Sequence, residues 1–182
     1  MELANLERIA KLMLWAVAHI SSLQREYLGL AAEFAVASQL CRRGLYAQLT
    51  LGMHKRTDLL VDTDASMLRI QVKAKQGRVW PNCIGVSGRD IVLILVDFAD
   101  KHESERPDFY ILTSDDWRNL VTKELKGPIS TGEVLLDDTN IPLWVRQVNK
   151  QGQPYKGMGV SVSQISAYRE CWDRIKTMVS SR

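Results

Sequence analysis

The chain has 182 residues, of which 46% are hydrophobic and 25% charged, and its net charge is +3. This composition is ordinary for a folded domain, so it excludes disordered and fibrous proteins, and the length favours one core rather than two. A small positive charge permits a polyanionic partner but does not require one.

Apolar residues at spacings of three and four predict an amphipathic helix over residues 3–20. Its apolar run is too short for a membrane span of about 20 residues, and Lys11 interrupts the apolar region that a signal peptide needs. Around Leu12–Trp15 the apolar surface extends almost all round, so a partner must cover it. We expect a homodimer through this helix, the alternative being that the final helix of the same chain covers it.

A second helix is expected to follow, with Ser21 and Gln24 as a capping box and its end at Arg43, before Gly44. After Gly44 the apolar period changes to two. Residues 58–61 and 68–75 are predicted to form a hairpin with its turn within 62–67. Residues 91–98 are continuously apolar, which indicates a strand covered on both faces, and 109–112 form a further short strand.

The C-terminal third is less regular. A helix capped at Ser114 ends near Gly127, and residues 127–160 are punctuated by Gly and Pro and are not assigned to elements. A last helix begins near Gln164. We predict a single α/β domain over 1–182, with an N-terminal helix at 1–20, a core at 21–126, and loops with a C-terminal helix at 127–182.

Cys41, Cys83 and Cys171 are odd in number and widely spaced, without a C-x-x-C pair. This pattern argues against a disulfide framework and a zinc site, and it favours a reducing cytoplasm. The three histidines show no i, i+4 pair, so we expect each to be a surface or packing residue.

The hairpin brings polar side chains together. If its turn is centred between Asp64 and Ala65, Asp58 stands directly opposite Gln71, with Cβ atoms about 4.5–5.5 Å apart. Gln71 and Lys73 project from one face of their strand, so Asp58, Gln71 and Lys73 should converge. A one-residue bulge would break this register.

The second helix supplies a fourth residue. Its expected apolar stripe includes Glu33, and a carboxylate in a stripe is costly to bury unless it is paired. Small neighbours such as Ala31 and Ala32 let the helix approach the sheet, where Asp58 and Lys73 can compensate Glu33. The predicted stripe consists of Leu30, Phe34, Ala37, Leu40 and Cys41.

These residues resemble the PD-(D/E)XK nuclease superfamily, whose pattern is a helix with Glu, then Asp on one hairpin strand and (D/E)-x-K on the next. The matching segments are G-L-A-A-E ending at Glu33, T-D-L-L-V with Asp58, and I-Q-V-K with Gln71 and Lys73. The chain looks most similar to the branch that reads Q-V-K, which includes a group-I-intron homing endonuclease type and bacterial proteins. The resemblance covers residues 27–80 and extends loosely to residues 109–114 and the helix after them.

The resemblance implies a restriction-endonuclease-like core, in which a central mixed β-sheet is flanked by helices, and a DNA endonuclease that depends on Mg²⁺ or Mn²⁺. Asp58 is then the principal metal ligand, with the Gln71 amide and the Val72 carbonyl completing the set. Lys73 orients or deprotonates the attacking water or balances charge, and Glu33 holds an outer water or a second metal.

Two departures from the family pattern bear on activity. Gln71 removes one negative charge from the metal site, which predicts weaker metal binding, and Thr57 stands where the family has proline. The alternative is therefore a non-catalytic DNA-binding or protein-interaction module on the same fold. Each residue also has an ordinary structural explanation, as a hairpin edge, a solvated strand face or a charge at a stripe margin.

Basic residues near the predicted site favour contact with a DNA backbone. We assign this role to Lys55, Arg56, Lys75 and Arg78, with Arg42 and Arg43 nearby. The alternative is an ordinary charged surface. The segment 151–159 contains several glycines but lacks a G-K-[S/T] ending, so we interpret it as a loop and not as a phosphate-binding motif.

Overall fold

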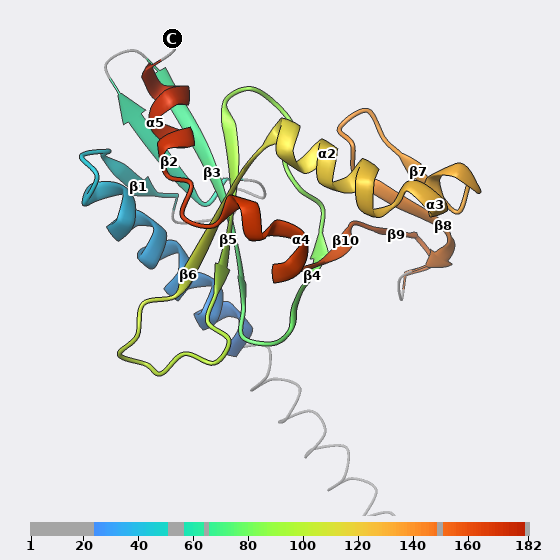
Figure 1. The fold of residues 1–182 in the computed structure, drawn as a ribbon, viewed down its shortest axis with the longest axis horizontal. Coiled ribbons are helices and arrows are strands. Elements are labelled where there is room, and N and C mark those ends of the chain that lie inside the picture. Colours follow the sequence, from blue (N-terminus) through green and yellow to red (C-terminus); the bar gives the residue numbers. More distant parts are fainter. Residues whose placement is uncertain (1–23, 51–56, 64–65, 149–150, 181–182) are drawn as a thin grey trace, which may run out of the picture.

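A computed structural model describes residues 24–50, 57–63, 66–148 and 151–180. Its centre is a five-stranded sheet in the order β1-β2-β3-β5-β6 (Figure 1). The strands are β1 (Ala47–Leu49), β2 (Leu59–Thr63), β3 (Ser66–Lys75), β5 (Ile91–Asp97) and β6 (Asp108–Thr113). Only β3 and β5 pair in parallel, so the sheet is mixed.

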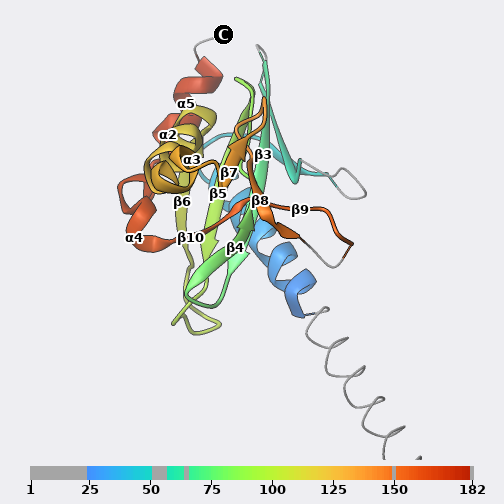
Figure 2. The same ribbon diagram turned by 90° about the vertical axis from the view of Figure 1, so that its right-hand side faces the viewer.

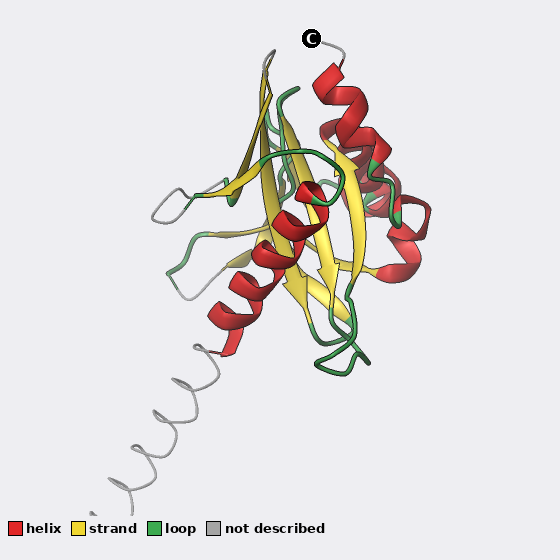
Figure 3. Cartoon of the chain, turned by 90° about the vertical axis from the view of Figure 1, so that its left-hand side faces the viewer, coloured by secondary structure: helices red, strands yellow, loops and turns green. Residues whose placement is uncertain are grey.

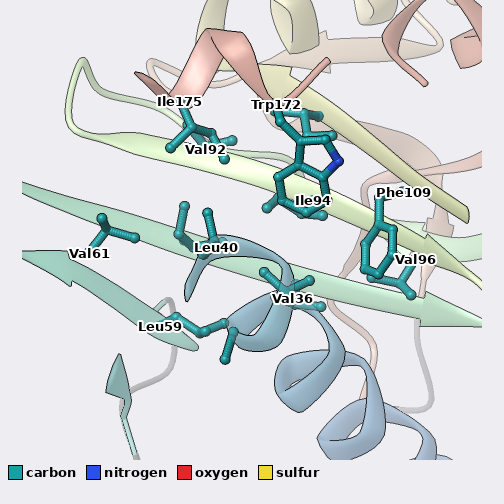
Figure 4. Packing of buried hydrophobic residues seen from close by; sticks show 14 of the residues in the cluster. Val36, Leu40, Leu59, Val61, Val92, Ile94, Val96, Phe109, Trp172 and Ile175 are labelled. Atoms are coloured by element: carbon teal, nitrogen blue, oxygen red, sulfur yellow. The ribbon is translucent and has the colours of Figure 1, made fainter. Parts of the chain in front are cut away.

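Helices cover the sheet, as the sequence predicts for an α/β domain. A helix over residues 24–41 crosses one face, together with Trp172 and Ile175 from the C-terminal segment (Figures 3 and 4). Helix α2 (Ser114–Glu124) packs Trp117, Leu120 and Val121 into a separate cluster with the alternate residues of β5 (Figure 2). The expected central mixed sheet flanked by helices is confirmed.

β5 shows why a continuous apolar run forms the centre. All seven residues are buried, and they alternate between the two clusters. Val92, Ile94 and Val96 face the 24–41 helix, whereas Leu93 and Leu95 face α2. The prediction of a strand covered on both faces is therefore confirmed.

The apolar stripe predicted for the second helix is partly wrong. Ala37 and Leu40 are buried as expected, but the residues that meet the sheet beside them are Ala32 and Val36. Leu30, Phe34 and Cys41 are exposed. Small Ala side chains let the helix lie close to β-branched strand residues, so the larger apolar residues lie on the outer side. The helix ends before Gly44, whose φ of +78° suits glycine.

The segment left unassigned, 127–160, holds two small sheets. β7 (Val134–Leu136), β8 (Pro142–Val148) and β9 (Pro154–Lys156) form one, and β10 (Met158–Ser161) pairs with β4 (Val79–Cys83) in the other. Helix α2 ends at Glu124 instead of Gly127, and its N-cap is Thr113 instead of Ser114. A short helix, α3 (Lys126–Ser130), contains Gly127.

The single C-terminal helix expected from Gln164 is wrong. The structure has α4 (Val162–Ile165), the 3-10 helix η1 (Ser166–Tyr168) and α5 (Asp173–Ser180). Between them Arg169 bridges to Tyr110 of β6, and Glu170, at φ 55°, donates its N–H to the Phe109 carbonyl. Pairing with the sheet edge thus replaces helical hydrogen bonds at this point.

None of the helices in the described part of the chain is long and apolar enough to cross a membrane. The helix predicted over 3–20, the Ser21 cap and the dimer contact through Leu12–Trp15 lie outside the described residues.

Candidate functional site

Asp58 sits at a fork where β2 separates from β3. In the ladder Leu59 faces Ile70 and Val61 faces Leu68, as predicted. Asp58 precedes β2 and donates its backbone N–H to the Ile70 carbonyl at 2.9 Å. Two consecutive residues thus face Ile70, which is the arrangement of a β-bulge. The predicted direct opposition of Asp58 and Gln71 is therefore wrong.

The bulge directs the Asp58 carboxylate to the backbone of β3. Its Oδ2 accepts the Val72 N–H at 2.6 Å, on the edge of β3 that β2 has left. The neighbouring chain holds Asp58 in place, because Thr50 donates its N–H to the Asp58 carbonyl at 3.0 Å and its hydroxyl to the Thr57 carbonyl. The carboxylate is thus fixed beside Val72 by backbone contacts.

Val72 presents its backbone groups to this fork. Arg69 of β3 donates its backbone N–H to the Asp90 carbonyl, and the Lys75 carbonyl accepts the Phe98 N–H. Residues 90 and 98 flank β5, so these two residues of β3 direct their backbone groups toward β5. Backbone polar groups of successive strand residues point to opposite edges, so Val72 directs its groups away from β5 and toward the fork. The Val72 carbonyl therefore lies on the same edge as the Asp58 carboxylate.

Glu33 joins Asp58 from the 24–41 helix. Burial raises the pKa of the Glu33 carboxyl, and the negative charge of Asp58 raises it further. Burial also raises the pKa of Asp58, while the hydrogen bond from Val72 and the charge of Lys73 partly oppose this. Two half-buried carboxylates thus lie near enough to repel each other, and the Lys73 ammonium lies within electrostatic range of Asp58. The roles predicted for these residues stay predictions.

Lys73 acts on the site through the charge of its ammonium group. Its positive charge lowers the pKa of Asp58 and also opposes the burial that raises the pKa of Cys83 to about 12. Within the described residues its ammonium makes no ion pair. A half-exposed cation beside two carboxylates is therefore available to an anionic ligand.

Gln71 occupies a cavity next to this group. Its side chain is 6% exposed, and no described residue hydrogen bonds to its amide. The cavity has a volume of about 120 Å³, and Thr139 and Ile141, from the segment between β7 and β8, line it with Arg69 and the 84–87 loop. Arg69 is fixed by a bidentate pair with Asp90 at 2.9 Å. The Gln71 side chain thus forms part of the wall of this cavity.

Oxygens of the kind that a hard divalent cation prefers lie at the fork, namely the Asp58 carboxylate and the Val72 carbonyl, with the Glu33 carboxylate within electrostatic range of Asp58. A cation would also relieve the repulsion and the desolvation that raise the pKa of both carboxyls. No cluster of three His, Cys, Asp or Glu occurs among the described residues, so the charge of the site is low.

The predicted basic contacts fall into different environments. Arg78 is exposed in the turn between β3 and β4, and a groove lined by Gln76, Gly77 and Arg25 lies beside it. Lys75 is buried, where it pairs with Asp97 at 2.5 Å and lies over the Trp80 ring. Lys75 is therefore not exposed to DNA, which corrects its assignment. Lys55 and Arg56 lie outside the described residues.

Two features of the site could not be predicted from the sequence. The bulge at Asp58 has no glycine or proline to mark it, and the contact of Thr50 with Thr57 depends on β1, which is only three residues long. The cavity around Gln71 is completed by Thr139 and Ile141, far along the chain in a segment without periodicity.

No protein-family model matches the sequence, and no curated protein matches it significantly. Among solved structures, the chain is similar to a bacterial homing endonuclease, I-Ssp6803I, at 19% sequence identity. The alignment covers 86% of this chain and 95% of the other, with a TM-score of 0.44.

Proposed function

We propose that the chain is a Mg²⁺-dependent DNA endonuclease of the PD-(D/E)XK type, with Gln71 at the second acidic position. One observation carries this proposal. The Asp58 carboxylate is held at the fork by the Val72 N–H, within electrostatic range of Glu33 and of Lys73, which makes no ion pair with another described residue. Charges that a fold leaves uncompensated in this way are typical of functional sites.

Each residue has a separate role in the proposed reaction. Asp58 and the Val72 carbonyl would hold the ion, Gln71 would add a neutral oxygen, and Glu33 would hold an outer water or a second ion. When bound, such an ion would supply the chemistry that lowers the pKa of a water and polarises the phosphate. Lys73 orients that water and stabilises the charge that develops on the phosphate oxygens. Mn²⁺ should replace Mg²⁺ because both accept oxygen ligands.

The partner follows from the same chemistry. A phosphodiester backbone brings negative charge to Lys73, and exposed Arg78 adds sequence-independent affinity beside it. A homodimer through the segment that contains Leu12–Trp15 would present two such sites to the two DNA strands. The scattered cysteines support a cytoplasmic location for the enzyme.

The test is cleavage of plasmid or branched DNA by the purified full chain. Cutting should require Mg²⁺ or Mn²⁺, and both Asp58→Ala and Lys73→Ala should abolish it. Asp115→Ala is the matched control, because the Asp115 carboxylate is exposed on α2, away from the fork. This variant should cut DNA as the wild type does. Unchanged cutting by both site variants would refute the assignment.

Gln71 supports a second candidate, a DNA-binding or protein-interaction module that has lost catalysis. The amide removes a negative charge from the set, and the described part of the chain offers no third carboxylate in its place. A folded sample that binds DNA but gives no heat with Mn²⁺ would favour this candidate over the endonuclease.

A further inference from the structure

The outer half of the β8–β9 hairpin projects from the folded domain. Along β8, Pro142 is buried, Leu143 and Trp144 are half-buried, and residues 145–148 are all exposed. Residues 151–154, which lead into β9, are exposed as well. Neighbouring side chains of a strand point to opposite faces, so consecutive exposed residues mean that both faces are open to solvent. We call residues 145–148 and 151–154 the hairpin arm.

The base of the arm is fixed beside the candidate site. The Tyr155 hydroxyl donates a hydrogen bond to the Asn82 side chain, which belongs to β4. Ile141, the residue before β8, lines the same cavity as Gln71 of β3. The arm therefore extends from a base that is anchored on β4 and adjoins β3, the strand that carries the candidate site.

A bulge in β8 sets Arg146 apart from the neighbouring strand. Two consecutive residues of β9 face Trp144 and Val148, so residues 145–147 of β8 have no counterpart on β9. Extra residues of this kind bend a strand and redirect its side chains, and they are frequent next to functional sites. The arm thus presents Arg146 and Gln147 on a strand segment that is exposed and not paired with β9.

The charge of the arm is complementary to a polyanion. No Asp or Glu occurs between Asp138 and Glu170, although the chain has 21 such residues. Arg146 makes no ion pair with a described carboxylate. The other described residues of the arm are glutamines, valines, a glycine and a proline. A projecting element with a cation, several amides and no acid suits the surface of a nucleic acid.

We propose that the hairpin arm enters the major groove of duplex DNA, where Arg146 and Gln147 contact base edges. The major groove is about 12 Å wide and admits a two-stranded ribbon. The Arg146 guanidinium matches the two acceptors on the edge of guanine, and the Gln147 amide matches the donor and acceptor on the edge of adenine. This inference rests on the proposed nuclease function and adds to it an element that selects the sequence to be cut.

Selection of bound duplexes from a pool of short DNA with a randomised centre tests the proposal. The full chain is used in EDTA, so that binding is measured without cleavage. The wild type should enrich a sequence that contains guanine. Fluorescence anisotropy should then show a preference for the enriched duplex over a scrambled one, and Arg146→Ala should reduce this preference roughly tenfold or more.

Two further variants make the test specific to base recognition. Arg146→Lys should lose the preference but keep the affinity for the scrambled duplex, because lysine retains the charge and lacks the planar fork of the guanidinium. Lys123→Ala is the matched control, since Lys123 is exposed on α2, which Figure 2 shows on the opposite side of the molecule from β9. This control should keep the wild-type preference. Thermal melting of the Arg146 variants should match the wild type, because Arg146 is exposed.

The outcomes separate this proposal from the nuclease function. Binding of DNA by the wild type without sequence enrichment, or an unchanged preference in both Arg146 variants, would overturn the role of the arm and leave the nuclease function standing. A preference that depends on Arg146 in a chain that does not cut DNA with Mg²⁺ would support the arm and contradict the nuclease function. A folded wild type that binds no duplex DNA would overturn both.

Discussion

β3 carries two lysines with opposite surroundings. The Lys75 side chain is 3% exposed, and its ammonium is satisfied by Asp97 at 2.5 Å, by the Gly77 carbonyl at 3.1 Å and by the Trp80 ring. Two residues earlier on the same face, Lys73 is half-buried and has no ion pair among the described residues.

The carboxylates beside the two lysines differ in the same way. Asp97 also accepts the Ala99 N–H at 2.9 Å, so both members of the buried pair are fully engaged. Glu33 and Asp58 instead repel each other, and their pKa values are raised. One strand thus holds a closed charge pair that supports the fold and an open group of charges that a ligand can complete.

The largest expected effect is on cleavage. Lys73→Met should reduce DNA cutting by roughly 10²–10³-fold, because it removes one preorganised electrostatic group from the reacting phosphate. Its melting temperature should stay close to that of the wild type, since no described ion pair is lost. Rates of plasmid nicking at saturating Mg²⁺ measure this, and a variant that cuts normally would contradict the open-site interpretation.

Removal of the buried Lys75–Asp97 pair should instead reduce the stability of the fold. Asp97→Ala leaves the Lys75 ammonium buried without its partner, which costs about 3–5 kcal/mol in the free energy of unfolding. Asp115→Ala removes an exposed pair with Arg118 and should cost less than about 1 kcal/mol. Denaturant titration compares the two. Equal small losses would mean that the Lys75–Asp97 pair does not support the fold.

Removal of a charge from the open site should stabilise the chain. The raised pKa of Asp58 means that the folded state binds protons more tightly than the unfolded state does, so stability falls as pH rises from below 3.8 through the folded pKa. Asp58→Asn should therefore raise the melting temperature at pH 7 by roughly 2–4 °C. The gain should vanish near pH 3, where the wild-type carboxyl is protonated. A lower melting temperature at pH 7 would contradict the assigned cost of burying this carboxylate.

The smallest effect concerns the outer surface. Arg78→Ala should weaken DNA binding nearly equally for all sequences and reduce the slope of log affinity against log salt by about 1. Arg118→Ala, on α2, should leave that slope unchanged. Fluorescence anisotropy at several salt concentrations measures both variants. A slope that Arg78 does not affect would exclude this turn from the DNA contact.

The sequence predicted the parts of the fold whose burial has a simple period. β5 was evident because its first six residues are apolar, and the hairpin because β3 alternates, although the bulge at Asp58 was not marked. The helix stripe was misjudged because Ala32 and Val36 pack against the sheet while the larger Phe34 does not. The size and spacing of the apolar side chains alone do not reveal which side of a helix must approach a sheet closely.

The candidate site was predicted where local pattern defines it. Glu33 and Lys73 each lie within electrostatic range of Asp58 because one helix and one hairpin place them, and these elements are local in sequence. The partners of Lys75 and Gln71 were not predictable, since Asp97 and Thr139 come from elements with no sequence signal linking them to β3. The prediction that Lys75 is exposed and contacts DNA was wrong, because the sequence of a strand does not distinguish a lysine that is paired and buried from one that is solvated.

The open group of charges at the fork is proposed to bind a divalent cation. Calorimetric titration of Mn²⁺ into the full chain at neutral pH tests this most directly, because it requires neither DNA nor catalysis. The wild type should bind Mn²⁺, Asp58→Asn should lose binding, and Asp115→Ala should retain it. Absence of heat with the folded wild type, or equal binding by Asp58→Asn, would contradict the claim.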